Sequence, residues 1–371
     1  MAPSIVIAAG GTGGHIYPGL ALGRALGRVA PGARVSFVGT PRGLEGKLIP
    51  GAGYELDLVD MVPFAGWRRA VLPAALVRAA VQARSILRRR AADVAVGMGG
   101  YASIPLILGA RLAGVPALVH ESGAVPGKAN LVAARLTRNV ATAFDEVVSA
   151  FPASATVRTV GMPLGPELSG FDRDALRDEA RQAFGLDDGT RFVLVSGGSQ
   201  GAASLNRLAV GLAQRWRHRG DVRILLKAGA RNLEEAQAAV AATGADKLVE
   251  VTRFIERMDH AYAAADVAVC RPGAGTVAEL AVVGLPAVLV PYPHAPSDHQ
   301  TRNAAALVEA GAAFLVRDHE ATAEVVGPLL ERVLDDRSEL ERMGSALRSI
   351  AHPRAADELA AWALELAGTA S

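Results

Sequence analysis

The 371-residue chain has a single cysteine, few aromatic residues and almost no net charge. Cys270 has no second cysteine with which to form an internal disulfide or a thiolate metal cluster, so nothing in the sequence requires an oxidising compartment. With Lys+Arg 39 and Asp+Glu 37, the formal charge is +2, which argues against a nucleic-acid partner. The length predicts two or three domains of about 150 residues each, and because half of the residues are hydrophobic, we do not expect general disorder.

The first residues do not resemble a secretory signal, and no long apolar helix is predicted. The first residues, Met-Ala-Pro-Ser, contain no basic region. Residues 94–110 carry no charge, but they contain four glycines and a proline and fall short of the roughly 20 apolar residues of a membrane helix. We therefore expect a cytosolic chain that does not cross a bilayer.

Glycine-rich segments follow short apolar runs in both halves of the chain. Residues 4–9 (SIVIAA) precede Gly10–His15, and residues 192–196 (FVLVS) precede Gly197–Ala202. Further strand candidates alternate with helical stretches, at 34–38, 94–96, 117–120, 224–227, 267–270 and 287–290. This alternation predicts an α/β fold with two similar domains, each a parallel sheet covered by helices on both faces.

Two glycines and two prolines within residues 160–166 indicate a domain boundary. We predict an N-terminal domain over residues 1–162 and a C-terminal domain over residues 163–347. The tail from 339 to 366 is predicted to be helical with an interruption near Pro353. Its last helix, about 348–371, either completes the second domain or packs back on the first.

A glycine-rich turn between a strand and a helix lets backbone N–H groups approach an anion at the helix N-terminus. Neither loop matches the dinucleotide fingerprint or a P-loop. Gly197–Gly201 does match the nucleophile elbow of serine hydrolases through Ser199. Its partners would come from Asp266, Asp298, His294 and His299. That fold needs one sheet, whereas this loop opens a second half that is built like the first.

Residues 271–280 (RPGAGTVAEL) follow the strand candidate 267–270 and allow two interpretations. Thr276 and Glu279 have the spacing of a capping box, which would satisfy helix N–H groups without a ligand. In a nucleotide-diphosphate pocket, the amides of residues 274–276 and the Thr276 hydroxyl would instead bind phosphate. Glu279 would then accept both ribose hydroxyls.

Polar residues follow several other strand candidates. His299, Gln300 and Asn303 lie in the loop region after residue 290 and are suited to sugar hydroxyls. In the first half, residues 97–101 and 120–123 should lie at the same sheet edge as Gly10–His15. The candidates for proton transfer there are His15, His120 and Glu121, because an attacking sugar hydroxyl must lose its proton.

Together these motifs resemble the MurG family of peptidoglycan glycosyltransferases, which transfer GlcNAc from UDP-GlcNAc to lipid I and form lipid II. The motifs are GGTGGH at 10–15, GGYASIP from 99, HES from 120, GGSQGA at 197–202, RPGAGTVAEL from 271 and HQ-x-x-N at 299–303. They occur in the family's order over nearly the whole chain. The resemblance implies a GT-B fold, with two Rossmann-like domains whose parallel sheets face a central cleft. It also implies an inverting displacement without a cofactor or an essential metal.

The resemblance further implies residue roles. His15 is the leading base candidate, and Glu121 is the second catalytic candidate. The UDP-sugar residues would be Thr12, Gly13, Gly14, Ser199, Gln200, Phe254, Ile255, Arg271, Ala274, Gly275, Thr276, Glu279, Gln300 and Asn303. Within this set, Phe254 and Ile255 would contact uracil and Gln300 the GlcNAc hydroxyls. The diphosphate of the polyprenyl-linked acceptor would contact Gly11, Gly13, Gly14, Gly99, Gly100 and Tyr101.

Two positions depart from the family pattern. Gly123 stands where the family usually has asparagine, and Gly165 where it usually has arginine. Loss of a buried, paired polar group changes discrimination by about 1–3 kcal/mol. Another UDP-sugar, another lipid-linked or natural-product acceptor, a UDP-GlcNAc 2-epimerase and a non-catalytic nucleotide-sugar binder therefore remain alternatives.

A lipid-linked acceptor implies a peripheral protein on the cytoplasmic side of the cell membrane. Apolar residues Phe64, Trp67, Leu72 and Leu76 occur among arginines at 68, 69, 78, 84 and 88–90. An apolar and cationic segment of this kind is predicted to dock on an anionic membrane surface. The alternative is an amphipathic helix that packs on its own domain while its arginines are solvated.

Overall fold

The computed structural model describes residues 2–61, 72–198 and 200–368. The chain forms two compact units. The first, here called the N-terminal unit, comprises Met1–Ser169 and His352–Ser371, and the second, the C-terminal unit, comprises Gly170–Ala351.

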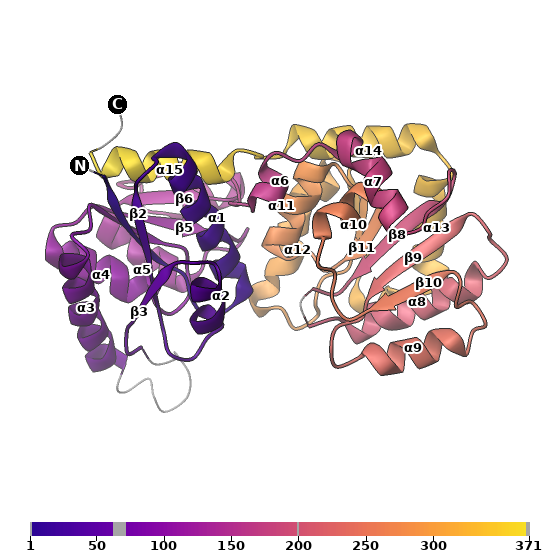
Figure 1. Ribbon diagram of the computed structural model, residues 1–371, viewed down its shortest axis with the longest axis horizontal. Coiled ribbons are helices and arrows are strands. Elements are labelled where there is room, and N and C mark those ends of the chain that lie inside the picture. The colour runs from indigo at the N-terminus through magenta and orange to yellow at the C-terminus, as the bar shows by residue number, and fades with distance from the viewer. Residues whose placement is uncertain (1, 62–71, 199, 369–371) are drawn as a thin grey trace. The chain divides into compact units, whose positions relative to one another are not determined.

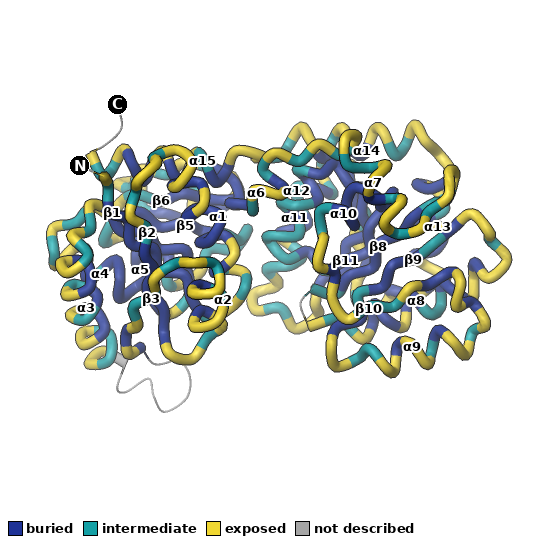
Figure 2. Tube along the Cα trace, viewed as in Figure 1, coloured by how far each residue is buried: buried dark blue, intermediate teal, exposed yellow. Residues whose placement is uncertain are grey.

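The N-terminal unit contains a parallel sheet of seven strands in the order β3-β2-β1-β4-β5-β6-β7. The strands are β1 (Ser4–Ala8), β2 (Arg34–Gly39), β3 (Glu55–Leu58), β4 (Val94–Gly97), β5 (Ala117–Glu121), β6 (Asn139–Thr142) and β7 (Thr156–Thr159). Strand β1 is buried along its whole length (Figure 2). Its alternating side chains therefore supply two separate cores, one on each face of the sheet.

Helices cover both faces of this sheet. The helices of this unit are α1 (Gly13–Val29), α2 (Glu45–Gly51), α3 (Leu72–Arg89), α4 (Ser103–Ala113), α5 (Lys128–Thr137), α6 (Pro166–Ser169) and α15 (Ala355–Leu366). Ile5 and Ile7 pack with α1 and α15, whereas Val6 and Ala8 pack with α3, α4 and α5. The helix α15 lies along α1 (Figure 1), so the end of the chain returns to the first unit.

The C-terminal unit contains a parallel sheet of six strands in the order β10-β9-β8-β11-β12-β13. The strands are β8 (Arg191–Ser196), β9 (Val222–Lys227), β10 (Val249–Thr252), β11 (Val267–Cys270), β12 (Ala287–Leu289) and β13 (Ala313–Leu315). The helices are α7 (Arg173–Ala183), α8 (Ala203–Arg215), α9 (Leu233–Ala241), α10 (Met258–Ala264), α11 (Ala274–Val283), α12 (His299–Glu309), α13 (Ala323–Leu334) and α14 (Arg337–Ser349). Val193 and Val195 pack against α8, α9 and α13 on one face.

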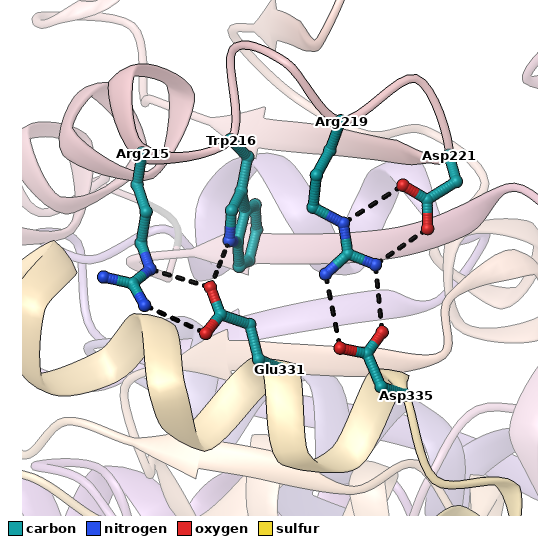
Figure 3. Close-up of polar contacts among 6 residues, drawn as sticks. All are labelled: Arg215, Trp216, Arg219, Asp221, Glu331 and Asp335. Carbon is teal, nitrogen blue, oxygen red and sulfur yellow. Dashed lines mark hydrogen bonds and ion pairs between the residues drawn. The ribbon is translucent and has the colours of Figure 1, made fainter.

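Hydrogen bonds between charged side chains connect α13 to the end of α8 (Figure 3). Glu331 on α13 accepts hydrogen bonds from Arg215 Nε (2.7 Å) and Nη2 (2.9 Å) and from Trp216 Nε1 (2.8 Å). One helical turn further on, Asp335 accepts from Arg219 Nη2 at 2.9 Å. The two arginines keep the pKa of Glu331 low, at about 2, mainly through the hydrogen bonds from Arg215. This carboxylate therefore stays ionised at neutral pH.

The strand order reverses once in each sheet, between β1 and β4 and between β8 and β11. Ligands of open α/β sheets bind at the carboxyl ends of the strands at such a switch point. The loops there are Gly10–Thr12 with 98–102 in the first unit, and residues 197, 198 and 200–202 with 271–273 in the second. The predicted α/β fold with two Rossmann-like domains is thus confirmed. Because the glycine loops lie at the two switch points, they are the candidate sites.

Candidate functional site

In the N-terminal unit, His15 is the third residue of α1 and its imidazole lies against the turn at Gly99–Gly100. Both glycines have positive φ, +96° and +78°. A Cβ atom at position 99 would lie 2.6 Å from His15 Cδ2. The absence of side chains at this turn therefore allows the imidazole to pack directly against the backbone.

The His15 side chain has the properties of a neutral base. Burial lowers its pKa from the ordinary value of 6.5, and the nearby Gly10 carbonyl opposes this effect. Its Nδ1 atom is buried and forms no hydrogen bond of standard geometry with any described residue. At neutral pH the imidazole is therefore uncharged and able to accept a proton.

The segment Thr12–Gly14 forms the start of α1. Thr12 is the N-cap residue, but its side chain makes no capping hydrogen bond, and Gly13 and Gly14 are the first helical residues. The N–H groups of a helix start have no partners within the helix, so they are available to an anion. Tyr101 lies across the switch point in the neighbouring loop and is exposed. The predicted acceptor residues thus occur in two loops at one sheet edge.

Glu45 holds the glycine loop at Gly10–Gly11 through hydrogen bonds. No local sequence signal indicated this role of Glu45. Its side chain is fully buried. Oε2 accepts a hydrogen bond from the Gly11 N–H (3.0 Å), and Oε1 accepts from the N–H and the hydroxyl of Thr40 (both 2.9 Å). Burial raises the pKa of the carboxyl, but these hydrogen bonds outweigh it, so the pKa is lowered overall. A buried carboxylate thus holds the Gly10–Gly11 turn in place.

His120, the other histidine considered for proton transfer, has structural contacts. Its Nε2 is 2.9 Å from the Gly161 carbonyl, which requires Nε2 to carry the proton, and Nδ1 is 3.2 Å from the Ser122 hydroxyl. Complete burial lowers its pKa to about 4. His120 therefore stays neutral and connects β5 to the segment after β7.

Glu121 organises the loop that follows it. Its Oε1 accepts from the Gly123 N–H (3.0 Å), and its Oε2 accepts from the Gly127 N–H (2.8 Å) and from Asn130 Nδ2 (2.9 Å). Burial raises its pKa against these hydrogen bonds. Both oxygens are occupied, which favours a positioning role. Its participation in proton transfer stays a prediction.

The two departures from the family pattern lie in tight surroundings. A Cβ atom at Gly123 would lie 3.3 Å from the Val125 carbonyl oxygen, closer than ordinary contact. At Gly165 a Cβ atom would lie 2.4 Å from Glu167 Oε2, at the end of a flexible side chain. A side chain at position 123 would thus require the loop to shift, whereas one at 165 would displace only Glu167.

In the C-terminal unit, a polar network fixes Arg271 at the end of β11. Its guanidinium donates to the carbonyls of Val290 (2.9 Å) and Pro291 (2.8 Å). It also contacts Asp318 Oδ1 at 2.6 Å and the Ser204 hydroxyl at 2.9 Å. The arginine side chain is only 10% exposed, and its hydrogen bonds hold the segment after β12 close to the start of α11. Sequence reasoning missed Asp318 and Ser204.

The helix α11 begins at Ala274 with Gly273 as its N-cap, and no side chain caps it. The capping-box interpretation of Thr276 and Glu279 is therefore wrong. Glu279 Oε2 instead accepts a hydrogen bond from the Tyr262 hydroxyl at 2.7 Å. Burial raises the pKa of Glu279 overall, although the Tyr262 hydrogen bond and the Lys227 charge act in the opposite direction. The carboxylate is thus held in place with one oxygen uncommitted among the described contacts.

The remaining predicted donor residues lie at the same sheet edge. Asn303 Nδ2 donates to the Pro272 carbonyl (3.1 Å), and Gln300 Oε1 accepts from the Tyr292 N–H (2.7 Å). After β10, Phe254 is exposed while Ile255 is buried. Gln200 is exposed, and Ser199 lies outside the described residues. Within the described ranges, no group of three or more His, Cys, Asp or Glu could hold a metal ion.

The serine-hydrolase fold has one sheet, whereas the described residues form two, and one of the predicted partners of Ser199 lies at the wrong sheet edge. Asp266 precedes β11, where it pairs with Arg177 at 2.6 Å and accepts from the Phe192 N–H at 2.8 Å. It thus lies at the amino end of the strands, whereas the 197–202 loop follows the carboxyl end of β8. The sheet separates this aspartate from any nucleophile in that loop.

The predicted membrane segment falls partly outside the described residues, which include neither Phe64 nor Trp67. Leu72 begins α3. Leu76 is half-buried and packs against the core between α3 and the sheet, whereas Val77 and Val81 are exposed. Along the described parts of the chain, no helix is long and apolar enough to span a membrane.

Comparison with known proteins identifies the family. Residues 5–142 match the glycosyltransferase family 28 N-terminal domain, and residues 192–359 match its C-terminal domain. A relative from Saccharopolyspora erythraea is 44% identical over 99% of this chain and 95% of its own. One from Mycolicibacterium vanbaalenii is 42% identical over 98% of this chain and 90% of its own.

Both relatives are UDP-N-acetylglucosamine–N-acetylmuramyl-(pentapeptide) pyrophosphoryl-undecaprenol N-acetylglucosamine transferases. The crystal structure of Acinetobacter baumannii MurG is also similar, with a TM-score of 0.79, 32% identity and coverage of 98% of this chain and 100% of that one. The chain therefore belongs to glycosyltransferase family 28 and, within it, to the MurG family.

Proposed function

We propose that the chain transfers N-acetylglucosamine from UDP-GlcNAc to the 4-hydroxyl of the N-acetylmuramyl sugar of lipid I, which yields lipid II. The curated relatives carry this activity in their names. The observation on which the proposal depends is that the chain contains two switch points with different chemistry, one in each unit. One presents a neutral histidine, His15, and the other presents a carboxylate, Glu279, beside an uncapped helix start.

For the donor, the start of α11 is suited to the UDP diphosphate. The N–H groups of residues 274–276 have no capping side chain, and the helix dipole favours an anion there. Glu279, steadied by Tyr262, would accept the ribose hydroxyls. Exposed Phe254 and its neighbour Ile255 would contact uracil, and Gln300 would bind the GlcNAc hydroxyls. Charge that develops on the leaving UDP would be stabilised by the same helix start.

For the acceptor, His15 would take the proton of the attacking hydroxyl. The oxygen forms a bond to the anomeric carbon as the bond from that carbon to UDP breaks. Attack from the face opposite UDP inverts the configuration. The N–H groups at Gly13 and Gly14 would hold the acceptor diphosphate, with Gly99, Gly100 and Tyr101 on the other side of the switch point.

The acceptor is a membrane lipid, so we further propose peripheral binding to an anionic membrane on its cytoplasmic side. Exposed Val77 and Val81 lie one turn apart on α3 and support an apolar contact surface. The charge of this region is partly neutralised, because Arg78 pairs with Asp60 (2.9 Å) and Arg89 with Asp57 (2.7 Å).

The decisive experiment incubates the full chain with UDP-GlcNAc and a short-chain lipid I analogue and measures the product mass. A disaccharide product with release of UDP would support the proposal, and EDTA should not abolish it. Donor binding without this product would favour another acceptor. Conversion of UDP-GlcNAc to its epimer, or release of a free epimerised sugar, without transfer would favour epimerase chemistry. Failure to bind UDP-GlcNAc would indicate a different sugar nucleotide.

A further inference from the structure

The C-terminal unit has a recess at the opposite edge of its sheet from the candidate donor site. A cavity of about 870 Å³ opens between α7, α11 and α14. Arg191 is the first residue of β8, Asp266 precedes β11 and Gly284 precedes β12, so the cavity lies at the amino ends of these strands. The donor residues follow the carboxyl ends of the same strands. The two sites are therefore separated by the sheet.

Five arginines line this cavity, at positions 173, 177, 191, 337 and 348. Two of them have carboxylate partners: Arg177 pairs with Asp266 at 2.6 Å and Arg337 with Glu341 at 2.9 Å. Over the described parts of the chain, the other three form no ion pair within 4.0 Å. Four carboxylates also line the cavity, at positions 172, 174, 266 and 341, so its arginines exceed its carboxylates by one and three of them lack a direct carboxylate contact within the described residues.

Arg173 is the most constrained of these groups. One of its nitrogens, Nη2, donates to the Ala265 carbonyl, while Nε is buried and makes no hydrogen bond with any described residue. Burial and the like charges of Arg177 and Arg348 lower its pKa to about 10, although the carboxylates of Asp266 and Asp174 act in the opposite direction. Like charges held together in this way would be stabilised by an anion placed among them.

Arg348 is placed to contact such an anion. Its guanidinium lies over Gly284 on the cavity floor, where a Cβ atom would come within 2.4 Å of Nη1. Its only hydrogen bond within the described residues goes to the Ser345 hydroxyl of its own helix, at 3.3 Å. Several N–H groups of this exposed arginine therefore remain available. Guanidinium groups pair with phosphate in a bidentate geometry.

From this arrangement, we propose that the cavity binds a phosphate-class dianion through the guanidinium groups of Arg348, Arg191 and Arg173. The site is distinct from the donor site and does not depend on the proposed transferase activity. The same chemistry is offered by free inorganic phosphate or a soluble phosphomonoester and by the phosphomonoester headgroup of a lipid. The experiment has to distinguish these two sources.

The first test titrates sodium phosphate into the full chain by calorimetry at constant ionic strength, once without UDP and once with UDP, because UDP occupies the donor site but also carries a phosphate dianion that competes at the cavity. Arg348→Gln should weaken phosphate binding by about tenfold or more, because it removes a charged hydrogen-bonding group. The matched control is Arg342→Gln on the same helix. Arg342 pairs with Glu339 at 2.7 Å and does not line the cavity, so its variant should bind phosphate like the wild type.

The second test identifies the source of the phosphate group by flotation with phosphatidylcholine vesicles that contain or lack phosphatidic acid. Binding that needs phosphatidic acid, falls in Arg348→Gln and is displaced by phosphate supports a lipid headgroup. Calorimetric binding without such a vesicle effect supports a soluble ligand. The proposal is overturned if wild type and Arg348→Gln bind both phosphate and vesicles equally, or if the wild type binds neither. Because the comparison is between two arginine variants, it stays informative even if UDP does not bind.

Discussion

Replacement of Glu45 by glutamine should loosen the glycine loop in front of α1. The carboxylate accepts hydrogen bonds through both oxygens, from Gly11 on one side and from Thr40 on the other. A glutamine retains one oxygen and places an NH₂ group at the position of the second. One of the two backbone N–H groups would then face a donor instead of an acceptor.

The size of the effect follows from the confinement of this side chain. A Cβ atom at Gly43 would lie 1.8 Å from Glu45 Oε2 and one at Gly39 would lie 2.6 Å from Glu45 Cγ, so the carboxylate fits closely among glycine backbones. A hydrogen bond to a charged group contributes about 1.5–3 kcal/mol. Its loss should therefore raise the opening equilibrium of the Gly11 region roughly ten- to hundredfold.

Hydrogen exchange measured by NMR or mass spectrometry on the segments that contain Gly11 and Thr40 tests this prediction. Thr40→Val is the matched control, because it removes only the hydroxyl bond and should cost about 1 kcal/mol. The lowered pKa of Glu45 means that its stabilisation is present above the unfolded pKa and is lost as the pH falls through the folded value. The reasoning is refuted if Glu45→Gln exchanges like the wild type at neutral pH, or if the difference between them persists in acid.

Three further outcomes are expected. His15→Ala should lower kcat about 10²- to 10⁴-fold with little change in UDP affinity, and an unchanged kcat would exclude His15 as the base. In the wild type, kcat should rise with pH and level off above a pKa that lies below 6.5. Tyr262→Phe should weaken UDP binding about fivefold, because Glu279 loses the hydrogen bond that holds it. Calorimetry measures this change. A lower unfolding midpoint with unchanged UDP affinity would show that the contact is purely structural. Glu331→Gln should lower the unfolding midpoint at neutral pH, because Arg215 loses its carboxylate partner. That difference should vanish as the pH falls from about 4.5 to about 2, and a midpoint difference independent of pH would contradict it.

The central strands and the glycine loops could be predicted from the sequence because their signals are local. A continuous apolar run such as residues 192–196 indicates a strand buried on both faces, and the glycines after it mark the turn into a helix. The short strands β3, β6, β7, β10 and β13 were not predicted. In β3 (ELDL) charged and apolar residues alternate, and its exposed edge position removes the apolar signal.

The two glycine loops have the same local pattern, but their supporting residues differ. Glu45 is 34 positions away from the Gly11 amide that it holds, and Asp318 is 114 positions away from Ser204. No pattern within a short window connects such pairs, because the fold alone brings them together. The first loop is held by the carboxylate of Glu45, and next to the second loop lies Arg271 with its carboxylate partner Asp318. The repeated pattern in the sequence therefore predicts where each loop turns, whereas the charge behind each loop, and hence its affinity for an anion, depends on long-range contacts.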